Sequence, residues 1–95
     1  MFKDLDPILH SQLRLSIVSI LMSVEEANFS YIKEETQATS GNLSIQIKKL
    51  QEAGYIKVKK TFRNNYPNTA LSITKKGIEA FEKYVEDLKK YINPK

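Results

Sequence analysis

The side chains most suited to chemistry in this sequence are cations that gather in the middle of the chain. Residues 39–76 hold eight Lys or Arg side chains against one acid, Glu52, so this segment carries a formal charge of +7 within a chain of net charge +4. Such side chains neutralise phosphates. A basic middle between acidic flanks therefore indicates a surface for a polyanion, although a solvated lysine-rich face would have the same composition.

Residues that catalyse reactions or hold metals are scarce. The 95 residues include no Cys and one His, His10, which excludes disulfides, thiolate nucleophiles and a His-pair metal site within one copy. Adjacent acids such as Glu34 and Glu35 diverge by about 100° on a helix, so they form no acid–base dyad. We therefore expect no enzyme, no cofactor and no metal.

The composition is that of one globular domain spanning residues 1–95. Apolar residues make up 41% of the chain and charged residues 27%. No apolar run approaches the roughly 18–20 residues that span a bilayer. The first residues also lack the basic and apolar regions of a signal peptide. We expect a cytoplasmic protein without a membrane partner.

Three helices are expected in the first half of the chain. Asp6-Pro7 resembles a helix start, and apolar residues on nearly all sides of residues 6–22 predict a helix that is buried on two faces. Ser30 is expected to cap a short helix over residues 31–36, with Tyr31 and Ile32 facing inward. After a brief turn, Thr39 is expected to cap a helix over residues 40–53 that ends at Gly54.

A hairpin and a last helix are expected to follow. Ile56 and Val58 alternate with lysines, and Leu71 and Ile73 alternate with small residues, which predicts an antiparallel hairpin. Residues 63–68 are rich in turn formers, which indicates a long tip. Apolar residues at intervals of three or four then predict a helix over residues 74–92, which begins with Thr74 as its cap.

This order of helix, short helix, turn, helix, hairpin and helix resembles the winged-helix transcriptional regulators of the MarR/ArsR type, in particular their small stand-alone branch. The motifs that carry the resemblance are Leu5-Asp6-Pro7-Ile8-Leu9-His10-Ser11 with Leu13-Arg14-Leu15, Gly41-Asn42-Leu43-Ser44, Leu50-Gln51-Glu52-Ala53-Gly54-Tyr55-Ile56, and Leu71-Ser72-Ile73-Thr74-Lys75-Lys76-Gly77. The resemblance implies a mainly α fold with a small β-hairpin (α+β), a winged helix-turn-helix. It also implies a homodimer that binds DNA through its third helix.

Helical periodicity independently supports a recognition helix, the helix that enters the major groove, at residues 40–53. Leu43, Ile47 and Leu50 share one face, and small, polar or basic residues occupy the other. Ile45 on that second face either meets a thymine methyl group or contacts a protein. Residues 57–72 of the predicted hairpin would form a wing that contacts the DNA backbone and minor groove. The predicted DNA-binding residues are Thr39, Ser40, Gly41, Asn42, Ser44, Ile45, Lys48, Lys49, Lys59, Lys60, Arg63, Asn64, Asn65 and Tyr66.

Residues 6–22 and 74–92 are expected to form the dimer interface. Its predicted residues are Ile8, Leu15, Val18, Met22, Phe81, Tyr84, Val85, Leu88 and Tyr91. Two copies would then read successive major grooves of a pseudo-palindromic DNA site. Two alternatives remain open at this point: a protein–protein interaction module, and a protein that coats DNA without sequence preference. The sequence does not specify an effector ligand.

Overall fold

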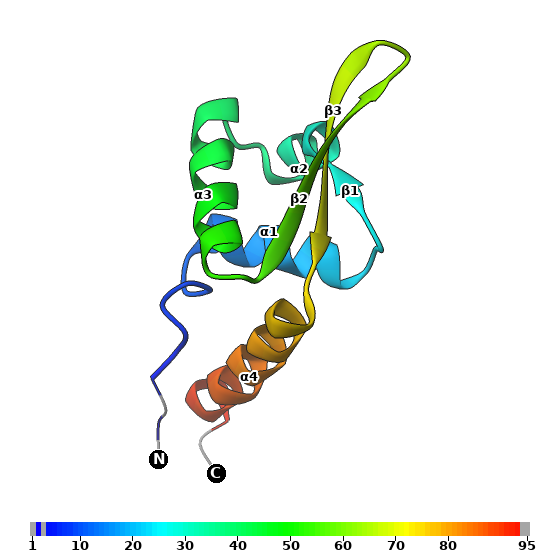
Figure 1. The fold of residues 1–95 in the computed structure, drawn as a ribbon. Helices are drawn as coiled ribbons and strands as arrows, with labels where there is room; N and C mark the ends of the chain where they lie inside the picture. Colours follow the sequence, from blue (N-terminus) through cyan, green and yellow to red (C-terminus); the bar gives the residue numbers. More distant parts are fainter. Residues whose placement is uncertain (1, 3, 94–95) are drawn as a thin grey trace.

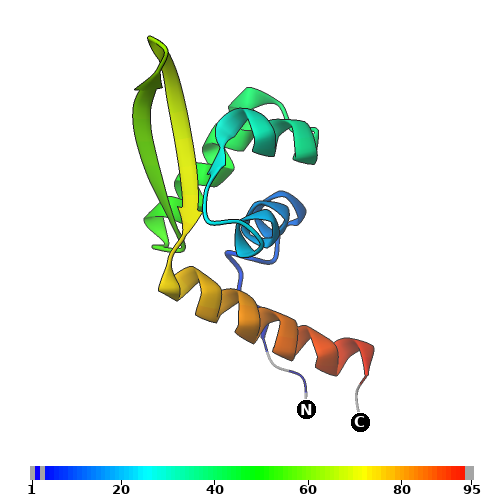
Figure 2. The same cartoon turned by 90° about the vertical axis from the view of Figure 1, so that its right-hand side faces the viewer.

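The computed structural model describes Phe2 and residues 4–93, which form four helices and three strands (Figure 1). The elements are α1 (Gln12–Met22), β1 (Ala27–Asn28), α2 (Phe29–Thr36), α3 (Ser40–Glu52), β2 (Ile56–Arg63), β3 (Tyr66–Ile73) and α4 (Lys75–Ile92). The molecule is elongated, with extents of 55 × 25 × 21 Å. The β2–β3 hairpin, which we call the wing, projects at one end and α4 lies at the other (Figures 1 and 2).

The first helix begins at Gln12, so the predicted start at residue 6 is wrong. The Asp6 carboxylate accepts a hydrogen bond from the backbone N–H of Ile8, and the N–H of His10 donates to the Asp6 carbonyl, both at 2.8 Å. These bonds close a single turn. Ser11 is then extended, with φ −152° and ψ 127°, and its side chain accepts from Arg14 N to start α1. The Asp-Pro pair therefore caps an isolated turn, and a second cap begins the helix.

The second helix also begins earlier than its most obvious cap indicates. Asn28, and not Ser30, caps α2, because the Asn28 side chain accepts a hydrogen bond from Tyr31 N at 2.8 Å. The Tyr31 side chain is 47% exposed, contrary to the prediction that it faces inward. Ile32 is buried as predicted. Asn28 and Ser30 are both good capping residues, and Asn28 sets where α2 begins.

The turn into the third helix is confirmed. Gln37 adopts the left-handed conformation at φ 59°, and the Thr39 side chain accepts a hydrogen bond from Asn42 N at 3.2 Å. Leu43, Ile47 and Leu50 are buried, as their spacing predicts. These three side chains anchor α3 on α1 and leave the opposite face of α3 to solvent.

The sheet contains a strand that the sequence did not indicate. Its order is β1-β3-β2, and the two-residue β1 is too short to show an alternating pattern. The tip of the wing also differs from the prediction of a long loop. Arg63 pairs with Tyr66, so Asn64 and Asn65 alone make the turn, with φ of 52° and 66°. Asn tolerates this conformation, and such two-residue turns match the twist of a hairpin.

A network of hydrogen bonds fixes the start of α4 against the end of α3. The Thr74 side chain accepts from Gly77 N at 3.0 Å and donates to the Gly54 carbonyl at 2.6 Å, while Thr74 N donates to the Tyr55 carbonyl. Gly77 lies so close that a Cβ atom there would be 2.2 Å from the Tyr55 carbonyl oxygen. The junction between β3 and α4 therefore requires glycine at this position.

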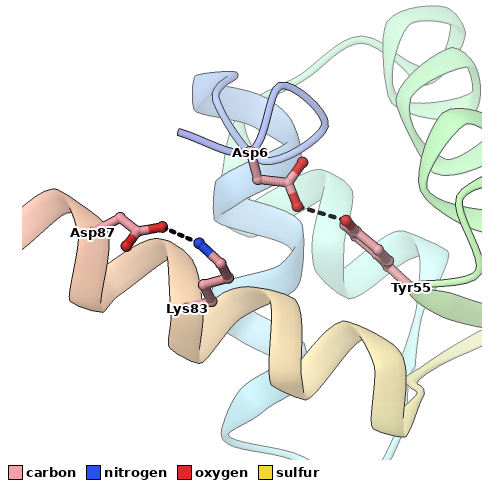
Figure 3. A network of polar contacts seen from close by, with 4 residues as sticks. All are labelled: Asp6, Tyr55, Lys83 and Asp87. Atoms are coloured by element: carbon pink, nitrogen blue, oxygen red, sulfur yellow. Dashed lines mark hydrogen bonds and ion pairs between the residues drawn. The ribbon is translucent and has the colours of Figure 1, made fainter. Parts of the chain in front are cut away.

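The N-terminal segment is held to this junction by Tyr55. The Tyr55 hydroxyl donates to the Asp6 carboxylate at 2.5 Å (Figure 3). Burial, together with this bond and the negative charge of Asp6, raises the pKa of Tyr55 to about 12. On α4, the buried carboxylate of Asp87 is paired with Lys83 at 2.6 Å, also visible in Figure 3.

Candidate nucleic-acid interface

The exposed face of α3 combines small, apolar and basic side chains. Gly41, Ser44, Ile45 and Lys48 are all exposed, opposite the buried stripe of the same helix. A Cβ atom at Gly41 would meet no atom within 4 Å outside its own stretch of helix, so the backbone there is open to close approach. Ile45 is 55% exposed. This face therefore presents a shallow surface with one prominent apolar side chain.

A groove separates α3 from the wing and brings two of the predicted lysines together. Its volume is about 350 Å³. The residues that line it are Phe29, Ser44, Ile47, Lys48, Gln51, Val58, Lys60 and Thr69. Lys48 of α3 and Lys60 of β2 thus border one concave surface. Two ammonium groups around such a groove attract an anion such as a phosphate.

The other wing lysines lie on the opposite face of the hairpin. Lys60 pairs with Thr69 and Val58 with Leu71, so all four side chains share the face that borders α3. Lys59, one residue from Lys60, points to the other face together with Lys57. The structure therefore brings Lys48 and Lys60 together and separates both from Lys59.

A polar network that sequence reasoning missed lies beside the N-terminal half of α3. Arg14 donates from Nε to the Ile8 carbonyl at 2.6 Å and from Nη1 to the Gln46 side-chain oxygen at 2.5 Å. Gln46 in turn donates to the side-chain oxygen of Asn42 at 3.0 Å. This fixes the amide of Asn42, a predicted DNA-binding residue. The i, i+4 spacing of Asn42 and Gln46 was the available sequence signal.

The tip of the wing exposes aromatic rings. Asn64 and Asn65 are exposed as expected, and Tyr66 is 74% exposed. Phe62, which was not among the predicted site residues, is 79% exposed. The side chain of Arg63 lies outside the part of the chain that the structure describes.

Most of the predicted dimer residues contact the chain's own core. Val18 and Tyr84 are buried within the chain, with exposed fractions of 0% and 5%, so neither offers a surface to a second copy. The partly buried residues that pack on the core include Ile8, Leu15, Met22, Phe81 and Leu88. Val85 is half-buried and Tyr91 is 45% exposed, and the Tyr91 ring stacks on Phe2. The dimer interface stays a prediction, without Val18 and Tyr84.

Within Phe2 and residues 4–93, no three His, Cys, Asp or Glu side chains are grouped to hold a metal ion. Nor does any helix of these residues have the length and apolar character that a membrane crossing requires.

Over residues 13–92 the sequence matches the family described as winged helix DNA-binding domain. The chain belongs to this family. The winged helix fold predicted from the motifs is therefore confirmed, and the family is one of DNA-binding domains and not a class of enzymes.

Solved structures share the fold. A transcriptional regulator homologue from Pyrococcus horikoshii is similar to this winged helix chain at 32% identity and a TM-score of 0.85, over 92% of this chain and 86% of that one. NadR in complex with 4-hydroxyphenylacetate shares the fold, with 18% identity and a TM-score of 0.73, over 93% of this chain and 64% of NadR.

A relative of similar size was found by sequence. An uncharacterized protein from Methanocaldococcus jannaschii is 36% identical to this winged helix chain over 81 residues, which are 85% of this chain and 88% of the relative. The similarity to this relative therefore extends over most of the chain.

Proposed function

We propose that this winged helix chain binds a specific sequence of double-stranded DNA as a homodimer and regulates transcription. In this proposal, α3 lies in the major groove and the wing contacts the backbone and the neighbouring minor groove. The observation that carries it is the exposed face of α3, which borders a groove shared by Lys48 and Lys60. One concave basic surface beside one protruding helix matches the alternation of groove and backbone in a duplex.

The size and chemistry of α3 support this placement. A major groove about 12 Å wide admits one α-helix. Gly41 and Ser44 leave room for close approach, and Ser44 can bond a base edge while Ile45 contacts a thymine methyl group. At the start of α3, the backbone N–H groups beside Thr39 and Ser40 suit a phosphate oxygen.

The homodimer is proposed to form along α4. This helix is 18 residues long and extends away from the wing (Figure 2). Its Val85 is half-buried and its Tyr91 is 45% exposed. A second copy would cover the apolar side chains that remain accessible there. Two copies related by a two-fold axis would read a pseudo-palindromic site with half-sites about 10 base pairs apart.

Binding to duplex DNA as a function of salt tests the proposal. For a dimer that neutralises roughly 6–10 phosphates, log affinity should fall steeply and linearly with log salt. Selection from random duplexes should recover one two-fold symmetric sequence, and sedimentation should give twice the mass of the chain. Absence of binding at low salt would reject the proposal, and binding without sequence preference would favour DNA coating instead.

Ile45 favours a second candidate function, a module that binds another protein. Its side chain is 55% exposed at the centre of the α3 face. Replacing Lys48, Lys49 and Arg63 together by Gln separates the two functions. A DNA-binding protein should lose affinity for all duplexes, whereas a protein-binding module should keep its partner.

A further inference from the structure

We propose that Phe62 at the tip of the wing is an apolar wedge that enters the minor groove, inserts between two base pairs and bends the DNA. This inference rests on the proposed DNA binding and adds a deformation of the duplex to it. Its basis is an exposed aromatic side chain on a projecting, positively charged hairpin.

The exposure of the wing tip is unusual for its residue types. Phe62 is 79% exposed and Tyr66 is 74% exposed, and Pro67 beside them is also exposed. Phe62 and Pro67 are partners in the strand register, so their side chains share one face. A water-exposed Phe contributes nothing to a core, and a cluster of exposed apolar side chains is typical of a binding surface.

The position of Phe62 directs it to the same side as the groove beside α3. Phe62 lies two residues beyond Lys60 on the same strand, so both side chains project from the face that borders α3. The register of β1 with β3 ends at Ala70, and four further residue pairs carry the hairpin about 14 Å past that strand. Figures 1 and 2 both show this hairpin projecting clear of the helices.

Charge identifies the occupant as a nucleic acid. Residues 56–73 contain Lys57, Lys59, Lys60 and Arg63 and no acidic residue. A hairpin of this composition is attracted to a polyanion from either face. A protein partner would have to bury the ring of Phe62 and also present a matching set of acidic side chains, whereas a duplex carries a row of negative charges along each strand.

The dimensions of the minor groove favour insertion of a side chain. This groove is about 6 Å wide and 7.5 Å deep, which admits side chains more readily than a two-stranded ribbon. Phe and Pro are among the residues that wedge between base pairs from the minor groove and kink the duplex. Pyrimidine–purine steps unstack most easily, so the wedge should prefer a TA or CA step in the minor groove beside α3.

The experiment uses a 30-base-pair duplex of alternating T and A, closed by a hairpin loop, in which every second step is TA. One adenine is replaced by 2-aminopurine to report unstacking, and dyes at the ends report bending by energy transfer. The proteins are the unchanged chain, Phe62→Ala, Phe62→Leu and the control Val24→Ala, whose side chain is also exposed but lies after α1. Circular dichroism and thermal melting establish that each variant folds.

At saturating protein, the unchanged chain and Val24→Ala should raise the 2-aminopurine fluorescence and bring the dyes together. Phe62→Ala should bind about tenfold more weakly and, when saturated, should do neither, because its methyl side chain cannot replace a stacked base. Phe62→Leu should keep part of both signals. A duplex with A-tracts in place of the TA steps should show a smaller bend.

Two results would overturn the inference. If the unchanged chain saturates the duplex without unstacking or bending it, or if Phe62→Ala behaves like the unchanged chain, there is no wedge, although DNA binding stands. If no protein binds the duplex at low salt, the proposed function fails and the wedge fails with it.

Discussion

The guanidinium of Arg14 in α1 donates a hydrogen bond to the side-chain oxygen of Gln46 in α3, across 32 positions of the sequence. Arg14 also binds the carbonyl of Ile8 in the turn before α1. One side chain therefore joins the N-terminal turn, α1 and the candidate recognition helix α3. Because Gln46 also holds Asn42, the contact reaches a residue of the proposed DNA surface.

Replacing Arg14 by Met should destabilise the fold by about 1–3 kcal/mol, because the hydrogen bonds to Ile8 and Gln46 are lost while the apolar stem is kept. Urea unfolding measures this change. Ser19→Ala, at an exposed position of the same helix, should alter the free energy of unfolding by less than about 0.5 kcal/mol. Equal stability of the two variants would show that the Arg14 contacts contribute nothing.

Ionisation of Tyr55 should lower stability at high pH. Its pKa is about 12 in the folded chain against an ordinary value of 10.0, so the neutral hydroxyl is favoured by folding. The stabilisation is complete below pH 10 and is lost as the pH rises from 10 to 12, a change of about 2 kcal/mol.

The Tyr55→Phe variant provides the measurement. It lacks the bond to Asp6 and should be less stable than the unchanged chain by about 1 kcal/mol at pH 8. Near pH 12 this difference should vanish or reverse. Ionisation of Tyr55 favours the unfolded state of the unchanged chain, whereas Phe at this position does not titrate. A difference between the two proteins that stays constant from pH 8 to 12 would contradict the assignment.

Alanine at Gly77 should be strongly destabilising, by more than about 3 kcal/mol, because its Cβ would meet the Tyr55 carbonyl oxygen at 2.2 Å. Gly41→Ala is the matched control, since its Cβ meets no atom within 4 Å. In the helical position of Gly41, alanine should stabilise the fold by up to about 1 kcal/mol. Thermal melting of both variants gives the comparison, and a stable Gly77→Ala variant would refute the close packing.

Replacing both Lys48 and Lys60 by Gln should reduce the slope of log affinity against log salt by about 2, because each lysine is proposed to neutralise one phosphate. The double variant Lys89→Gln, Lys90→Gln, on the far end of α4, should leave the slope unchanged. Fluorescence anisotropy with a labelled duplex at several salt concentrations provides both slopes. Both double variants remove two positive charges, so a general loss of charge would lower both slopes equally. Equal slopes for the two variants would therefore contradict a specific role for Lys48 and Lys60.

Local sequence patterns predicted the elements that are set by strong caps or by repeated burial. Thr39 and Thr74 cap α3 and α4 as expected, and Leu43, Ile47 and Leu50 form the predicted buried stripe. Where two signals compete, the pattern alone did not decide. Asp6 and Ser11 both cap, but the chain between them closes only one turn, so α1 begins after the second of them.

The parts of the candidate site that were missed depend on contacts between distant residues. The face on which Lys60 lies follows from its register with Thr69, and the groove it shares with Lys48 follows from how α3 packs beside the sheet. The role of Arg14 depends on a partner 32 residues away. Phe62 is different, because its place on the apolar side of the first strand, beyond Lys60, was visible in the sequence.

The contacts among Tyr55, Thr74 and Gly77 fix the start of α4 rigidly against the C-terminal end of α3. The Thr74 hydroxyl donates a hydrogen bond to the carbonyl of Gly54, just beyond the end of α3, and α4 begins at the next residue, Lys75. In a homodimer joined along α4, the angle between α4 and the rest of the chain would set the distance between the two copies of α3. A small change in this angle would be amplified over the 18 residues of α4 and would change the distance between the two α3 helices.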